Sequence, residues 1–131
     1  MAAPTITARG QNKSVEACTA NFVFSTTAAG NYDSTVKIPR NAQIIGVNAR
    51  ANVALTNGTN ITVKMGPAAS GAALTGTIAL GDLNAARKQD VQLAVAPLVI
   101  AAANDGGVIS ITTTGTFNAG DLDITVFYIV G

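Results

Sequence analysis

Apolar and polar residues alternate along most of this 131-residue chain, in short runs that are separated by Gly, Asn and Pro. Successive side chains of a β-strand point to opposite faces, so a period of two predicts strands with one buried side. Helical periodicity is nearly absent; a single helical turn is expected with Asp82 as its N-cap. The alternating runs predict strands at residues 15–26, 33–39, 44–55, 61–65, 77–80, 90–95, 108–113 and 122–130.

The more apolar side of each run predicts which side chains enter the core. In the first run this side carries Phe22 and Phe24, so both rings are expected to point inward. The run at 44–55 alternates cleanly, and its other side is expected to face water or a partner. Inward positions are further predicted for Ile45, Val47, Ala49, Ala51 and Val53 and for Ile61, Val63 and Met65. In the last two runs, one face is expected to carry Ile109, Ile111 and Thr113 and one to carry Leu122, Ile124, Val126 and Tyr128, and the final run has apolar residues on both of its faces.

Turn residues separate the runs. Asn57-Gly58 favours a tight hairpin between the strands on either side of it. The stretch "NAGD" at 118–121 is typical of a turn, and Asp105 in "NDGG" is typical of a turn residue.

About eight short strands joined in this way predict an all-β fold. The expected architecture is a two-sheet antiparallel sandwich, jelly-roll-like, with the final strand deep in a sheet or at an intersubunit edge. Residues 1–13 are polar and contain Pro4 and Gly10, so they are expected to form an extended N-terminal arm. Residues 14–131 are expected to form a single β-sandwich domain.

Charged residues are scarce, at 11% of the chain against roughly 25% in a typical soluble domain. Apolar residues make up 48%, aromatic residues only 5%, and Trp is absent. A weakly charged surface rich in Ala and Thr costs less to desolvate than a charged one, which favours a component of an assembly. A secreted or extracellular monomer with a neutral surface is the alternative.

The composition also argues against several classes of chemistry. The chain has no His, which removes the Ser-His-Asp triad, the Cys-His pair and most zinc sites. Its single Cys, Cys18, lies in an alternating run and is expected to be a small buried residue rather than a reactive thiol. We therefore expect neither an enzyme nor a bound metal or cofactor. The net charge of +1 and the scattered basic residues predict no binding to nucleic acid, and no apolar stretch is long enough to cross a membrane.

Two small groups of charged residues remain as candidates. Asp121 and Asp123 would share one face of a strand, about 7 Å apart, where two carboxylates can bind a cation or act as an acid/base pair. The simpler interpretation is that they solubilise the start of a strand. Candidate interface residues, for ion pairs at the rim of a contact, are Arg9, Lys13, Arg40, Arg87 and Lys88.

Two stretches resemble small structural proteins of tailed bacteriophages. The first matches a strand entry of the form I-P-x-x-A-x-I at Ile38, Pro39, Ala42 and Ile44. The second matches a C-terminal strand pair at Thr113, Gly115, Ala119, Gly120 and Tyr128. Together the two stretches cover roughly half of the chain, and they encode turns and strands rather than a site.

The resemblance implies a virion component made in the host cytoplasm. Within that group it implies a head decoration, or cement, protein: a jelly-roll-like domain that forms homotrimers, sits on the capsid exterior and bridges major capsid proteins. A tail or fibre component is an alternative from the same group. A small carbohydrate-binding β-sandwich is a further alternative, although such modules usually present Trp or Tyr platforms, and this chain has only Tyr32 and Tyr128.

Overall fold

The computed structural model describes residues 3–5, 14–85, 88–93, 98–99 and 107–130, with side chains omitted for 88–93 and 98–99. Within this part the chain is all-β apart from one short 3₁₀ helix, η1 (Leu80–Asp82). The strands are β1 (Glu16–Thr27), β2 (Gly30–Ile38), β3 (Ala42–Thr56), β4 (Asn60–Met65), β5 (Ala72–Ala79), β6 (Lys88–Leu93), β7 (Leu98–Val99), β8 (Gly107–Thr114) and β9 (Phe117–Val130).

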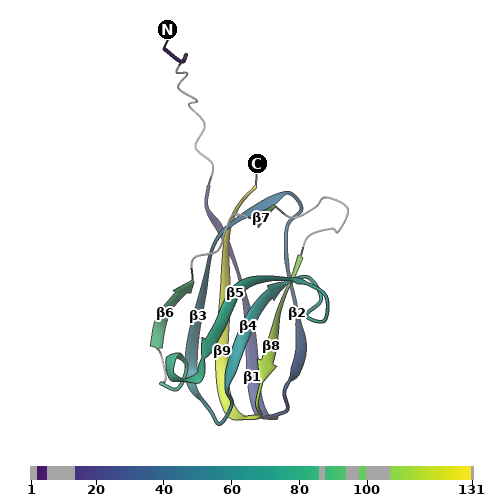
Figure 1. Cartoon of the computed structure of the whole chain (residues 1–131), viewed down its shortest axis with the longest axis vertical. Coiled ribbons are helices and arrows are strands. Elements are labelled where there is room, and N and C mark those ends of the chain that lie inside the picture. The colour runs from purple at the N-terminus through teal and green to yellow at the C-terminus, as the bar shows by residue number, and fades with distance from the viewer. Residues whose placement is uncertain (1–2, 6–13, 86–87, 94–97, 100–106, 131) are drawn as a thin grey trace.

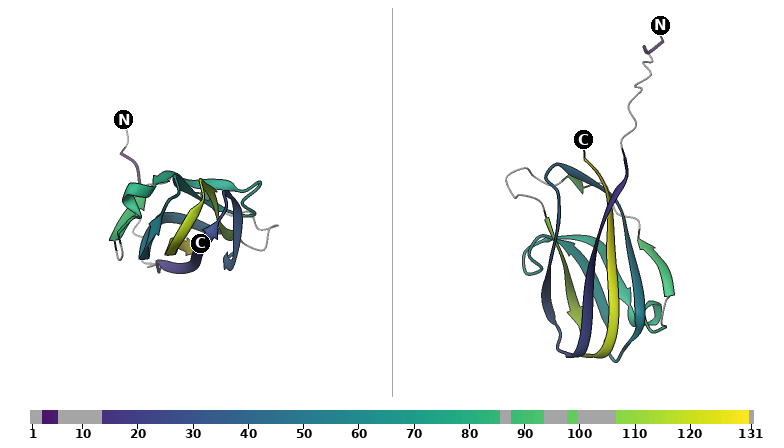
Figure 2. Two further views of the ribbon diagram at one scale, coloured as in Figure 1. Left: turned by 90° about the horizontal axis from the view of Figure 1, so that it is seen from below. Right: turned by 180° about the vertical axis from the view of Figure 1, so that it is seen from behind.

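The strands form two stacked antiparallel sheets (Figures 1 and 2). Sheet A has the order β1-β9-β3-β6, with β7 also pairing with β3, and sheet B has the order β2-β8-β4-β5. Sheet B lies at the front of Figure 1, and the right view of Figure 2 shows β1, β9 and β3 of sheet A side by side. The predicted two-sheet sandwich is therefore confirmed.

The pairing order is that of a jelly roll. When β7 is set aside, the first strand pairs with the last, the second with the one before last, and so on to the adjacent pair β4 and β5. Such nested antiparallel pairs arise when one long two-stranded ribbon is wound into two sheets. The final strand β9 lies between β1 and β3, so its predicted place deep in a sheet is also confirmed.

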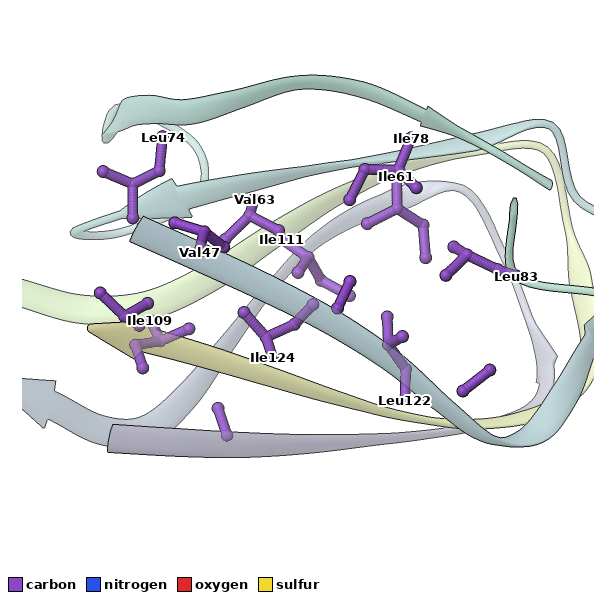
Figure 3. Close-up of a cluster of buried hydrophobic side chains, with 14 of the residues drawn as sticks. Val47, Ile61, Val63, Leu74, Ile78, Leu83, Ile109, Ile111, Leu122 and Ile124 are labelled. Carbon is purple, nitrogen blue, oxygen red and sulfur yellow. The ribbon is translucent and has the colours of Figure 1, made fainter. Parts of the chain in front are cut away.

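The core fills the space between the sheets and is built from aliphatic side chains of both (Figure 3). The face of the last strand that carries Leu122, Ile124, Val126 and Tyr128 is buried, and so are both isoleucines of β8. Figure 3 shows how the two sides meet: Val47, Leu122 and Ile124 of sheet A point toward Ile61, Val63 and Ile111 of sheet B. Met65 and Phe22, both predicted inward, are partly buried against this cluster.

One end of the core is closed by an aromatic pair. The rings of Phe24 and Phe117 are tilted by 39° with centroids 5.3 Å apart, which is a favourable separation for two aromatic rings. Gly58, in the turn between β3 and β4, lies against the Phe117 ring so closely that a Cβ there would come within 2.3 Å of it. The Asn57-Gly58 turn is thus present, and its glycine is required by packing.

The hairpin predicted around that turn is wrong. Strand β3 belongs to sheet A and β4 to sheet B, so the chain crosses between sheets instead of pairing back. Asn57 takes the left-handed conformation, with φ of 63°, that allows this change of direction. A turn dipeptide predicts a reversal of the chain, but it does not determine which strand becomes the partner.

Two inward positions predicted for β3 are also wrong. Ile45 and Val53 are exposed, by 42% and 54%, while Val47, Ala49 and Ala51 are buried as expected. The β3–β9 register shifts between Ile44 and Gly46, and again between Ala51 and Val53. A β-bulge inserts an extra residue and changes which face a side chain occupies, so strict alternation fails at these points.

Local predictions near two aspartates need correction. The stretch 118–121 is part of β9 rather than a turn, and Gly120 accommodates the local bend with φ of 143°. Asp82 is the last residue of η1, whose N-cap is Ala79. Asp105 lies outside the described residues, and so does most of the predicted arm 1–13, so the division into an arm and one domain stays a prediction.

Candidate functional site

The two outer sides of the sandwich differ in exposed apolar area. We call the outer side of sheet A face A and the outer side of sheet B face B. In the described part of the chain, every large hydrophobic side chain that is exposed lies on or directly beside a strand of sheet A. These residues are Val15, Val23, Ile45, Val53 and Val130.

Two of these side chains owe their position to the bulges in β3. At the second bulge the register passes from Ala51 opposite Leu122 to Val53 opposite Asp121. Asn52 and Val53 of β3 therefore both lie across from Asp121, and the side chains of both are on face A. The bulge adds an apolar side chain to this face without removing the polar one.

The centre of face A holds the carboxylate pair that was weighed from the sequence. Asp121 and Asp123 are half-buried on β9, and the amide of Asn21 on β1 donates to both, at 2.5 and 2.7 Å. From the other side, the amide of Asn52 on β3 donates to Asp123 at 2.8 Å and to Asp121 at 3.3 Å. Each carboxylate is thus held between two amides from neighbouring strands.

The cluster continues along the face as a row of small polar groups. The hydroxyls of Thr19 and Thr125 are 2.9 Å apart across β1 and β9. Arg50 stands opposite Asp123 in the β3–β9 register, and its Nε is buried with no hydrogen-bond partner among the described residues. An unpaired buried donor is costly. Strand β6, whose side chains are not described, pairs with β3 on either side of Arg50.

The arrangement can accept hydrogen bonds from a further cationic donor. Carboxylates that accept two amide donors keep outward lone pairs for a further donor, above all an Arg or Lys from a partner. Among the described residues no three His, Cys, Asp or Glu side chains come together as a metal site would require. The sequence pointed to Asp121 and Asp123 but missed Asn21 and Asn52, which had appeared only as polar members of alternating runs.

Of the predicted rim residues, only Arg40 has a side chain that the structure describes. Arg9, Lys13 and Arg87 lie outside the described residues, and Lys88 begins β6 with its side chain not described. Arg40 is exposed in the turn between β2 and β3. Their role at an interface stays a prediction.

On the inner side of sheet A, a tyrosine and the single cysteine lie close together. A hydrogen bond with the Cys18 side chain, burial, and the nearby Cys18 and Glu16 charges raise the pKa of Tyr128 from 10.0 to about 12. Cys18 is half-buried against the core, and its thiol also lies 3.8 Å from the carbonyl oxygen of Lys37. The cysteine is therefore partly buried rather than fully buried as predicted, and it has a polar neighbour.

Comparison with known proteins gives a likeness of fold. No protein-family model and no curated protein sequence matches the chain. Among solved structures, it is similar to a chain of the cyanophage Pam1 capsid asymmetric unit, with a TM-score of 0.64, 16% identity, and coverage of 99% of this chain and 94% of that one. The capsid of Ralstonia phage GP4 contains a similar chain, with a TM-score of 0.65, 16% identity, and coverage of 98% and 90%.

A third likeness is to a chain in the acid-stable capsid of the Helicobacter pylori bacteriophage KHP30. Here the TM-score is 0.52 at 15% identity, and the match covers 90% of this chain and 93% of that one. The three matches span nearly the whole of both partners, so what is shared is a complete fold rather than a common substructure.

Proposed function

We propose that this chain is a structural protein of a bacteriophage virion, and more narrowly a decoration, or cement, protein on the outside of the head. The observation that carries the proposal is the fold shared, over at least nine-tenths of each partner, with chains of three phage capsids. Low identity means that the likeness by itself shows a fold, so the role is our inference.

The surface chemistry supports a role in assembly. Only 11% of residues are charged, and face A adds exposed valines and an isoleucine to this neutral background. Exposed apolar side chains that gather on one side of a protein mark interaction sites more often than chance. A protein that buries such a surface across the joints between capsid subunits stabilises the shell by the free energy of that binding.

Symmetric self-association would strengthen the effect. A homotrimer presents three copies of each contact, so modest patches add up to a long residence time on the shell. The predicted arm at residues 1–13 would add a strand to a neighbour. No catalytic step, metal or cofactor enters the proposed role, and no helix among the described residues is long and apolar enough to cross a membrane.

Reconstitution on heads that were assembled without this protein tests the proposal. Purified protein is first sized by light scattering, then added to the heads, and bound protein is measured by co-sedimentation. We expect a self-associated protein, saturable binding, and heads that withstand a higher temperature before they break open. A monomer without affinity for heads would overturn the proposal, and binding to tails alone would favour the tail or fibre alternative.

The arm is tested separately by deleting residues 1–13. We expect weaker binding to heads with unchanged secondary structure by circular dichroism. Unchanged affinity would remove the arm from the mechanism and leave the β-sandwich as the part that binds.

A further inference from the structure

We propose that face A is the side that docks onto the capsid shell, and that its partner there is a protein segment presenting an Arg or Lys between small apolar side chains. This inference rests on the proposed function and names the surface and partner chemistry that it needs. Three features of face A carry it: the distribution of apolar side chains, the row in which they stand, and the way in which the carboxylates are held.

The apolar side chains favour face A over face B. Val15 and Val23 are exposed by 58% and 67%. Val23 lies on the outward side of β1, and Val15 is the residue directly before that strand. Face B presents Thr35, Lys37 and Thr112 on β2 and β8, and no large hydrophobic side chain is exposed among its described residues. Burying the valines on a partner would recover hydrophobic free energy that face B does not offer.

The register places these side chains in a defined row. Asp121 stands between Val23 of β1 on one side and Val53 of β3 on the other. Both neighbours are more than half exposed, so the carboxylate is flanked by apolar surface that a partner can cover. Covering it removes water from around the charge, and a charge-assisted hydrogen bond made there is then stronger than one in open solvent.

The carboxylates are pre-organised for a cationic donor. Asn21 binds both from the β1 side and Asn52 binds both from the β3 side, so neither carboxylate needs to be ordered when a partner arrives. Two carboxylates that share one amide nitrogen also repel each other, and a cation placed above them relieves that repulsion. A planar guanidinium matches such oxygens with two parallel hydrogen bonds.

These features select a protein segment over other occupants. A metal ion would use the carboxylates and leave the valines uncovered. A second copy of face A docked about a two-fold axis through Asp121 would bring like charges together, which disfavours that pairing. A segment with a cation between small apolar residues satisfies the carboxylates and the valines at once.

Binding to heads that lack this protein, measured for paired variants, tests the inference. We expect Asp121→Asn with Asp123→Asn to weaken binding at least about tenfold and to reduce its dependence on salt, because a charge contact is lost. Val23→Thr with Val53→Thr, which keeps the side-chain shape, should also weaken binding several-fold, without the change in salt dependence.

Matched controls lie on face B. Thr35→Val and Lys37→Gln should leave the affinity within about twofold, since their side chains are exposed on the opposite side of the sandwich. If the wild type binds heads but only the face B variants weaken binding, the inference is overturned while the proposed function stands. If the wild type does not bind heads, the proposed function itself fails.

Discussion

The two sheets use their polar side chains in different ways. In sheet B most of these side chains bond to the backbone: Ser110 donates to the carbonyl of Gly66 at 2.5 Å, and Ser34 donates to that of Ile109 at 2.6 Å. Asp33 accepts from the amide of Ala68 at 2.8 Å. In sheet A the outward polar side chains bond mainly to one another, as the two Asn and two Asp of face A do.

The difference separates side chains that hold the fold from side chains that shape a surface. Bonds from Ser110 and Asp33 fix the loop that follows β4 against sheet B, where Ala68 is buried. Bonds among Asn21, Asn52 and the two carboxylates fix no loop; they only hold outward groups in place. Polar groups on sheet B should therefore matter to stability, and those on face A to binding.

The largest expected effect tests whether both sheets share one core. Phe117→Ala removes a fully buried ring that packs on Phe24, and we expect the free energy of unfolding to fall by about 3–5 kcal/mol. Hydrogen exchange should quicken in both sheets together, and urea denaturation gives the energy. Phe117→Leu should cost less. If exchange quickens in one sheet only, the two sheets unfold as separate units, and the prediction of a shared core is wrong.

Ser110→Ala tests the structural role of sheet B. Removing the buried hydroxyl leaves the Gly66 carbonyl without this donor. We therefore expect the free energy of unfolding, measured by urea denaturation, to fall by about 1–3 kcal/mol. Thr112→Val on the same strand is the control, because its hydroxyl bonds only at the surface, and its effect should stay within about 0.5 kcal/mol. Equal losses for both would contradict the distinction.

Tyr128 contrasts the inner side of sheet A with its outer side. Because its pKa rises from 10.0 to about 12 in the folded state, the folded chain holds the phenol proton more tightly than the unfolded chain. This contribution to stability is complete below pH 10 and is lost as the pH rises toward 12.

Ultraviolet absorbance of tyrosinate, recorded in a Tyr32→Phe background, measures the titration of Tyr128 alone. Cys18→Ala should return the midpoint toward 10.0, since the hydrogen bond with Cys18 is the largest cause of the shift. A midpoint near 10.0 with Cys18 still present would show that neither the hydrogen bond with Cys18 nor burial raises the pKa of Tyr128.

The smallest expected effect concerns face A. Asp121→Asn with Asp123→Asn keeps the oxygen of residue 121 that accepts from both amides, but residue 123 keeps one acceptor where Asp123 uses two oxygens, for Asn21 and for Asn52. The substitution also removes the repulsion between the carboxylates, which offsets the loss of one partly exposed hydrogen bond. The free energy of unfolding should therefore change by no more than about 0.5 kcal/mol, as measured by urea denaturation. A loss above about 1 kcal/mol would show that face A, like sheet B, uses these groups for stability.

Much of the fold could be predicted because alternation reports burial directly. The residues that share a face in β9 and in β1 follow from a period of two, and both strands keep one register throughout their pairing with each other. Strand β3 carries the same signal, but its two bulges depend on how it fits against β9, which is a property of the pair. Ile45 and Val53 were therefore assigned to the wrong side.

Only two of the four residues of the candidate site could be predicted from the sequence, for a similar reason. Asp121 and Asp123 are two residues apart in the sequence, so their common face follows from local geometry. Asn21 and Asn52 lie far away along the chain and reach the carboxylates only through the pairing of three strands. Their one sequence signal was a polar residue on the solvent side of a strand, which most strands possess.

The pairing of Glu16 with Tyr128 sets where the sandwich can be extended. The chain enters β1 and leaves β9 at the same pole (Figure 1), so a peptide inserted directly before β1 or directly after β9 would start from that pole. The same proximity allows the start of β1 and the end of β9 to be joined by a short linker and the chain to be reopened at the opposite pole, between β8 and β9, giving a circular permutant with the original pairings.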